Sequence, residues 1–303
     1  IWNFFKIMKT IAIIGSGTRG NGIAHVFCLN GYRVNLIDLS QQVLDQAVNT
    51  ISLNMDRQIR KETISEEDKK RALDNLETGT HLEQGVESAD LVIEAVIENI
   101  DIKKEIFTSL DSFTPEETIL ASNTSSISIS QLASYTTRPD KVIGMHFMNP
   151  VPMMELVEVI SGYNTSDNTT KTVVDICRTI HKIPVEVQDY PGFIANRILM
   201  PMINESIYAL QEGVAGVSEI DTIMKLGMAH PMGPLQLADY IGLDVCLSIL
   251  KVMFNGFGDP KYAPCPLLVN MVQAGHLGRK SGEGFYLWEA GKKELVVSPM
   301  FMK

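Results

Sequence analysis

A glycine-rich turn between an apolar strand and a helical pattern constrains this sequence more than any other feature. Residues 10–14 (TIAII) form a continuous apolar run of strand length, as expected for a parallel strand that is buried on both faces. The turn 15–20 (GSGTRG) follows at once, apolar residues at helical spacing occupy 23–27, and a second strand is expected at 33–38 (RVNLID). This order of elements predicts the first unit of a doubly wound parallel sheet.

The residues of this turn have separate physical roles in an arrangement that binds dinucleotides. Gly15 permits the tight turn, Gly17 lets backbone N–H groups approach a pyrophosphate, and Gly20 lets the helix pack closely on the sheet. Thr18 and Arg19 lie at the start of the helix, whose N-terminus carries partial positive charge toward phosphates. We therefore expect these five residues to bind a dinucleotide cofactor.

An acidic residue at the end of the second strand distinguishes between the two nicotinamide dinucleotides. Asp38 follows Gly20 by 18 residues, the spacing at which a carboxylate accepts hydrogen bonds from the adenine ribose. Its charge would repel the 2′-phosphate of NADP, so NAD is the expected cofactor. The alternative interpretation is a glycine turn that merely packs, beside a surface aspartate.

Strand–helix alternation continues beyond this first unit. Further short strands are expected at 91–95 (LVIEA), 119–122 (ILAS) and 142–147 (VIGMHF), with helical stretches between them. Ser40 can cap a long helix that runs to about Lys61. The pattern predicts an α/β domain with a Rossmann-type, doubly wound and mostly parallel sheet.

The pattern changes after residues 189–192 (DYPG), where helical signals become dominant. This change predicts a boundary between the α/β domain and a smaller all-helical one. The helical stretches are expected at 193–211, 217–226 and 235–254. The chain is thus divided into an extra segment at 1–7, with Met8 as the natural start, an NAD-binding domain at 8–190 and a helical domain at 191–303.

Composition argues against several classes of protein. Twenty-six Lys and Arg against 36 Asp and Glu leave a formal charge of −10, which repels polyphosphate at long range and argues against nucleic-acid binding. No apolar run approaches the roughly 20 residues of a membrane-spanning helix. The four scattered cysteines favour reduced thiols over zinc ligands or disulfides. We expect a cytoplasmic protein with no metal and no membrane partner.

Six further motifs stand out along the chain: residues 121–126 (ASNTSS), 144–152 (GMHFMNPVP), 156–160 (LVEVI), 191–197 (PGFIANR), 233–235 (GPL) and 278–282 (GRKSG). With these motifs, the sequence from about Met8 to Trp288 resembles the 3-hydroxyacyl-CoA dehydrogenases, in particular their short, stand-alone bacterial form. The motifs agree in order and at family spacing, which is more specific than the glycine turn alone.

A histidine and a glutamate carry the chemistry that the resemblance implies. Oxidising a secondary alcohol needs a base for the hydroxyl proton, and His146 stands at the end of an expected strand, where open α/β sheets place ligands. Glu158 lies in an apolar segment, where a charge is costly unless it is paired. The resemblance makes His146 the general acid/base and Glu158 its orienting partner. The alternatives are an ordinary histidine and the solvent face of an edge strand.

The resemblance also implies contacts from uncharged polar residues. Ser125 and Asn196 would hydrogen-bond the substrate near its hydroxyl and thioester carbonyl, and Ser125 would also contact the cofactor. Asn149 would border the nicotinamide. Taken alone, Ser125 could be a turn residue, and Asn196 a polar residue near the start of a helix.

Four charged residues match family positions that contact ligands. The resemblance places Glu98, Lys103 and Lys280 at the cofactor and Lys61 on the phosphates of CoA. In isolation, Glu98, Lys103 and Lys280 are better explained as solvated surface charges. The solvent face of its own helix explains Lys61 equally well.

Two internal positions depart from the family pattern. Arg19 stands where the family usually has methionine, so this cation could contact a phosphate or crowd the cofactor. Glu155 stands where many members have lysine, which adds negative charge near Glu158. Neither departure removes a residue that the chemistry requires.

The activity implied by the resemblance is the interconversion of (S)-3-hydroxybutanoyl-CoA and acetoacetyl-CoA with NAD, in a homodimer whose helical domain closes over the substrate. The apolar stretch 241–254 is rich enough for a dimer interface, although ordinary core packing would explain it too. Two other functions stay open: an NAD-dependent dehydrogenase of a hydroxy acid or sugar acid without CoA, and a nucleotide-binding protein that has lost catalysis.

Overall fold

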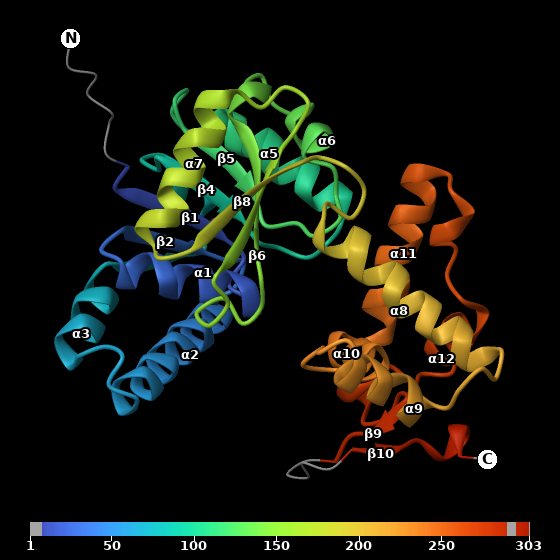
Figure 1. Cartoon of the computed structure of the whole chain (residues 1–303). Helices are drawn as coiled ribbons and strands as arrows, with labels where there is room; N and C mark the ends of the chain where they lie inside the picture. Colours follow the sequence, from blue (N-terminus) through green and yellow to red (C-terminus); the bar gives the residue numbers. More distant parts are fainter. Residues whose placement is uncertain (1–7, 290–294, 303) are drawn as a thin grey trace. The chain divides into compact units, whose positions relative to one another are not determined.

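A computed structural model describes residues 8–289 and 295–302, so the extra segment expected at 1–7 lies outside the described residues. The chain divides between Tyr190 and Pro191 into two compact units, and each is treated by itself below (Figure 1).

The first unit is built on an eight-stranded sheet with the order β3-β2-β1-β4-β5-β6-β7-β8. All neighbouring strands run parallel except β6 and β7, which are antiparallel. The fold class expected for this part is confirmed. The strands are β1 (Thr10–Ile14), β2 (Arg33–Ile37), β3 (Leu76–Gly79), β4 (Leu91–Glu94), β5 (Ile119–Ser122), β6 (Val142–Phe147), β7 (Leu156–Ser161) and β8 (Ile183–Gln188).

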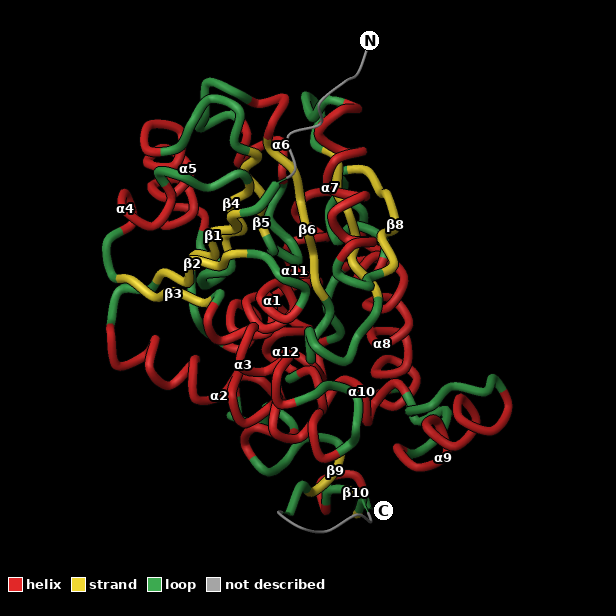
Figure 2. Tube along the Cα trace, turned by 90° about the vertical axis from the view of Figure 1, so that its left-hand side faces the viewer, coloured by secondary structure: helices red, strands yellow, loops and turns green. Residues whose placement is uncertain are grey.

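Helices cover both faces of this sheet. Figure 2 shows α1, α2 and α3 on one face and α4 and α5 on the other. Apolar side chains of α1, α2 and α7 form one core with the central strands, which are almost fully buried. The helices are α1 (Thr18–Leu29), α2 (Gln41–Arg60), α3 (Glu66–Asp74), α4 (Leu82–Val86), α5 (Ile100–Phe113), α6 (Ile129–Ala133) and α7 (Asp167–Thr179).

The strand order fixes where a ligand can bind. The chain runs outward from β1 through β2 to β3, then crosses back and continues on the other side of β1 with β4, β5 and β6. The loops that leave β1 and β4 therefore separate, and open α/β sheets bind ligands at such a point, beyond the carboxyl ends of the strands. The glycine turn follows β1 at this edge.

The described residues of the second unit form mainly helices, together with two strands of two residues each. Its helices are α8 (Ala195–Gln211), α9 (Val217–Thr222), α10 (Pro234–Ile241), α11 (Leu243–Phe257) and α12 (Pro266–Gln273), and its strands are β9 (Tyr286–Leu287) and β10 (Val296–Val297).

The prediction of a single helix at 235–254 is wrong, because two helices, α10 and α11, occupy this range. Gly242 separates α10 from α11 with φ at +106°, a conformation that L side chains rarely adopt. Leu243, Cys246, Leu250 and Met253 then face the core of this unit. Core packing therefore accounts for these four residues of the apolar stretch, whereas Val245 and Phe254 are exposed.

Membrane-spanning helices and metal sites are both absent from the described residues. No helix within them is long and apolar enough to cross a membrane. The same ranges contain no group of three or more His, Cys, Asp or Glu side chains placed to hold a metal ion. All four cysteines are buried, free thiols.

A buried histidine on α1 makes the stability of the first unit depend on pH. His25 is 1% exposed, and its Nε2 lies 2.9 Å from Oε1 of Gln58. Burial lowers the pKa of His25; the Gln58 hydrogen bond opposes this shift and the nearby Lys182 adds to it. The unfolded chain therefore takes up a proton near pH 6.5, where the folded chain does not.

We expect the melting temperature of the first unit to fall by a few degrees as the pH drops from 7 to 5.5. In His25→Gln this part of the pH dependence should flatten, because no imidazole is left to charge on unfolding. Exposed His81 provides the matched control, since His81→Gln should keep the wild-type slope. Thermal melts followed by circular dichroism measure this, and equal slopes in wild type and His25→Gln would contradict it.

Candidate active site

The glycine turn has the geometry that a close phosphate contact requires. Gly15 has φ at +92°, and a Cβ there would lie 2.8 Å from the carbonyl oxygen of Ala95. A Cβ on Gly20 would lie 1.7 Å from the carbonyl oxygen of Gly15, so neither position admits a side chain. A Cβ on Gly17 would meet nothing within 4 Å, so the backbone just before Thr18, the first residue of α1, is open to a ligand.

Asp38 is locked in place beside this turn by a residue that the sequence did not single out. The backbone N–H and the hydroxyl of Ser16 both donate to Oδ2 of Asp38 at 2.7 Å. The N–H of Leu39 donates to Oδ1, also at 2.7 Å. β1 and β2 are parallel neighbours, so Ser16 and Asp38 leave the sheet side by side. The glycine turn thus fits the pyrophosphate of a dinucleotide, and the Asp38 carboxylate fits its adenine ribose.

His146 and Glu158 form a buried pair across the antiparallel strands β6 and β7. They stand directly opposite each other in the register, and Nδ1 of His146 lies 2.8 Å from Oε2 of Glu158. Both side chains are almost fully buried, so the polar residue in each strand is paired, as a buried charge requires. The same register places Gly144 opposite Ile160, and a Cβ on Gly144 would collide with Ile160.

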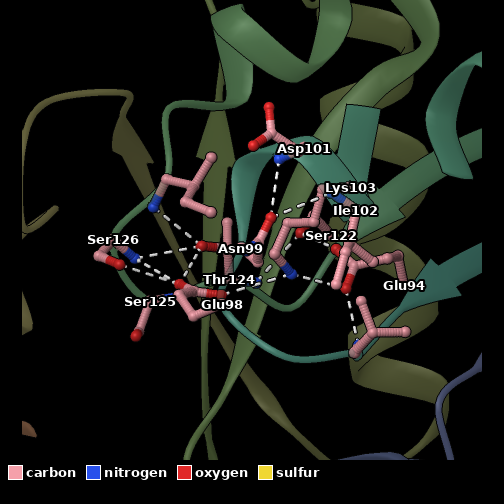
Figure 3. Close-up of polar contacts among 12 residues, drawn as sticks. Glu94, Glu98, Asn99, Asp101, Ile102, Lys103, Ser122, Thr124, Ser125 and Ser126 are labelled. Carbon is pink, nitrogen blue, oxygen red and sulfur yellow. Dashed lines mark hydrogen bonds and ion pairs between the residues drawn. The ribbon is translucent and has the colours of Figure 1, made fainter. Parts of the chain in front are cut away.

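A loop of hydroxyl residues after β5 is tied to a carboxylate after β4 (Figure 3). Oε1 of Glu98 accepts the backbone N–H groups of Ser125 and Ser126 at 3.0 and 3.2 Å, and the hydroxyls of Thr124 and Ser126. Burial favours a raised pKa for Glu98, but the Lys103 ammonium and these hydrogen bonds outweigh it and hold the pKa below its usual value. Glu98 is therefore a charged acceptor that shapes the loop carrying Ser125.

Asn123 links this loop to the strand that carries the histidine. Its side-chain Oδ1 accepts the backbone N–H of Phe147 at 2.9 Å, and its own N–H donates to the carbonyl oxygen of Glu94. The ends of β4, β5 and β6 are therefore joined by one residue next to His146. Asn123 stands inside the ASNTSS motif, but the sequence alone gives no sign of this contact.

The other residues implied by the resemblance occupy several parts of the chain. Lys103 is 1% exposed and its Nζ lies 2.6 Å from Glu94. Asn149 is exposed in the loop between β6 and β7, and Lys61 is exposed at the end of α2. Asn196 and Lys280 belong to the second unit, Asn196 in the first turn of α8 and Lys280 ion-paired with Asp244 at 2.5 Å.

Comparison with known proteins identifies both units. Residues 10–190 match the model of the 3-hydroxyacyl-CoA dehydrogenase NAD-binding domain, and residues 192–288 match that of the C-terminal domain of the same enzymes. The chain belongs to the 3-hydroxyacyl-CoA dehydrogenase family. NAD is therefore the cofactor of its first unit, as Asp38 predicts, and the chain is an NAD-dependent oxidoreductase of this family.

Relatives in this family are similar over nearly their whole length. A 3-hydroxybutyryl-CoA dehydrogenase of Bradyrhizobium diazoefficiens is 49% identical over 286 residues, covering 94% of this chain and 97% of that one. The human mitochondrial hydroxyacyl-coenzyme A dehydrogenase is 40% identical, covering 93% and 92%. The crystal structure of an (S)-3-hydroxybutyryl-CoA dehydrogenase from Ralstonia eutropha has a TM-score of 0.91 at 47% identity, covering 93% and 99%.

Replacing Asp38 by alanine should weaken NADH binding about 10-fold or more and reduce the preference over NADPH. The reason is that the carboxylate supplies charge-assisted hydrogen bonds to the ribose of NADH and repels the 2′-phosphate of NADPH. Fluorescence titration with both dinucleotides measures this. Exposed Asp45 on the following helix is the control, and Asp45→Ala should bind both as the wild type does. An unchanged preference in Asp38→Ala would refute this role.

Proposed function

We propose that this chain is an NAD-dependent 3-hydroxybutyryl-CoA dehydrogenase, which interconverts (S)-3-hydroxybutanoyl-CoA and acetoacetyl-CoA. The observation that carries the proposal is the buried His146–Glu158 pair, positioned at the carboxyl end of β6 in a chain of this family. The acyl group is taken from the bacterial relatives that bear this name.

His146 acts as the general base of the oxidation. NAD⁺ supplies the acceptor for the hydride that leaves carbon 3 of the substrate. Nε2 of His146 takes the hydroxyl proton as the carbonyl forms, while Nδ1–H donates to Glu158. The carboxylate fixes the tautomer and stabilises the imidazolium. In the reverse direction His146 returns the proton to the ketone oxygen, on which negative charge develops.

The remaining assignments follow the resemblance. Ser125 and Asn196 hold the substrate at its oxygen atoms, and Ser125 also contacts the cofactor. Glu98, with its side chain one-third exposed, can contact the cofactor directly, and Asn149 borders the nicotinamide. Lys280 contacts the cofactor and Lys61 the CoA phosphates, as exposed or half-exposed cations can.

The assembly and the compartment are part of the same proposal. Family resemblance supports a cytoplasmic homodimer formed by the second unit. Light scattering of the purified chain tests the oligomeric state.

The thioester substrate distinguishes the proposed function from its alternatives. With NADH, we expect kcat/KM for acetoacetyl-CoA to exceed that for free acetoacetate by at least about 100-fold, because binding energy from the remote CoA moiety is used at the reacting carbon. A preference for the free acid would favour a dehydrogenase of non-CoA acids. No oxidation of NADH with either compound would favour a non-catalytic nucleotide-binding protein.

His146→Ala should lower kcat by about 100-fold to 10,000-fold, the usual contribution of a general acid/base, while NADH still binds. Glu158→Gln should lower kcat less and change the pH–rate profile, since the amide keeps the size of the side chain and removes its charge. Exposed His81→Ala is the control and should turn over normally. Near-normal turnover in His146→Ala would overturn the assignment, and an unchanged profile in Glu158→Gln would contradict the pairing.

A further inference from the structure

A buried lysine lies beside the loop that connects the histidine strand to the glutamate strand. This loop comprises residues 148–155, between β6 and β7. Leu156 and Ile183 are paired where β7 and β8 begin, and the N–H of Ile183 donates to the carbonyl oxygen of Glu155 at 2.8 Å. Lys182 therefore stands next to the end of the loop, and it is only 8% exposed. Lysine is seldom buried to this extent unless its ammonium has partners.

The partners of the Lys182 ammonium are two backbone carbonyls of the loop. Nζ donates to the carbonyl oxygens of Val151 and Met154, each at 2.7 Å. These carbonyls belong to a turn in which the N–H groups of Met153 and Met154 donate to the carbonyl oxygen of Pro150 at 3.0 Å. One ammonium therefore joins both ends of the turn, and hydrogen bonds from a charged donor are stronger than those from a neutral one.

The charge of Glu155 favours the ammonium form of Lys182. Burial lowers the pKa of Lys182, and the negative charge of Glu155 opposes this shift. Glu155 is the position at which the resemblance expects lysine in many family members, and a lysine there would lower the pKa of Lys182 further. In this chain the departure from the family pattern thus supports the contact between Lys182 and the loop.

Helix α1 packs closely against the same turn (Figure 1). A Cβ added to Gly22 would lie 2.9 Å from Cβ of Val151 and 3.5 Å from Cδ of Pro152. Val151 itself is 1% exposed. Glycine at this position lets the helix that begins at the dinucleotide turn approach the loop. The loop is therefore held by α1 and by Lys182 together.

We propose that Lys182 is a positioning residue that holds the loop 148–155 and so fixes Asn149 beside the nicotinamide ring during hydride transfer. The inference rests on the proposed function, which assigns Asn149 to the nicotinamide. Asn149 is exposed and directly precedes Pro150, whose carbonyl oxygen anchors the turn. The position of Asn149 thus depends on the turn that Lys182 connects to β8. A misplacement of about 1 Å at a reacting group can cost about 100-fold in rate.

Lys182→Met keeps the length of the side chain and removes its N–H donors. We expect kcat for acetoacetyl-CoA reduction to fall about 10-fold, because the nicotinamide ring is held less well for transfer. NADH should bind about 5-fold more weakly, while ADP-ribose, which lacks the nicotinamide, should bind within about 2-fold of wild type. Lys171, which is exposed on α7, provides the matched control, and Lys171→Met should behave as wild type in all three measurements.

Adding Asn149→Ala to Lys182→Met shows whether Lys182 acts through Asn149. Asn149→Ala alone should lower kcat about as much as Lys182→Met does, and the double variant should cost little more. Hydrogen exchange provides a readout independent of turnover: the amides of Met153 and Met154, which donate to Pro150, should exchange faster in Lys182→Met. Wild-type protein that cannot reduce acetoacetyl-CoA would refute the proposed function, whereas the comparison of NADH with ADP-ribose would still test Lys182.

Three results would overturn the proposal. An equal loss of affinity for ADP-ribose and NADH would show that the whole dinucleotide site is disturbed. Additive effects of Asn149→Ala and Lys182→Met, or a lower melting temperature with normal kcat and normal exchange, would leave Lys182 a structural role only. Should Lys182→Met not fold, Lys182→Gln, which keeps an N–H donor, is measured against the same outcomes, and its failure to fold as well would also show a structural role.

Discussion

The hydrogen bond between His146 and Glu158 depends on the one antiparallel pairing in the first unit's sheet. Strands β6 and β7 place the two residues directly opposite each other, where side chains of one face come within bonding distance. A slip of one residue would turn one side chain to the other face and leave a buried polar group unpaired. The pairing of Gly144 with Ile160 opposes such a slip, because no larger residue than glycine fits against Ile160. The antiparallel pairing of the consecutive strands β6 and β7 thus fixes the geometry of the His146–Glu158 pair.

The other site residues of the first unit depend on the parallel part of the same sheet. β1, β4, β5 and β6 are successive neighbours, so their carboxyl ends lie along one edge. The glycine turn, Glu98 and the hydroxyl loop follow β1, β4 and β5 in that order, and His146 lies near the end of β6. The strands are buried on both faces, so the loops at this edge are attached to rigid elements.

Sequence patterns predicted those elements that are determined by residues adjacent to one another in the chain. β1, β5 and β6 have the predicted bounds, because buried parallel strands read as short apolar runs. The glycine turn between a strand and a helix is likewise a local signal. Strands β3 and β8 were not predicted, because they lie at the two edges of the sheet and mix polar with apolar residues. The contacts of Ser16 with Asp38 and of Lys103 with Glu94 could not be predicted either. Each joins different segments, and a lysine in an otherwise ordinary helix gives no local sign that it is buried.

The carboxylates at the carboxyl edge of the sheet do not prevent an acidic chain from binding an anionic dinucleotide. Asp38, Glu98 and Glu158 each accept hydrogen bonds from the protein, and so each organises donors around it rather than standing as an unpaired charge. A pyrophosphate at the glycine turn would meet the backbone N–H groups and Arg19 at the start of α1, whose attraction acts within the first turn. The net charge of −10 acts over a longer range and is screened beyond about 10 Å in ordinary salt. Local geometry therefore outweighs overall charge at the glycine turn.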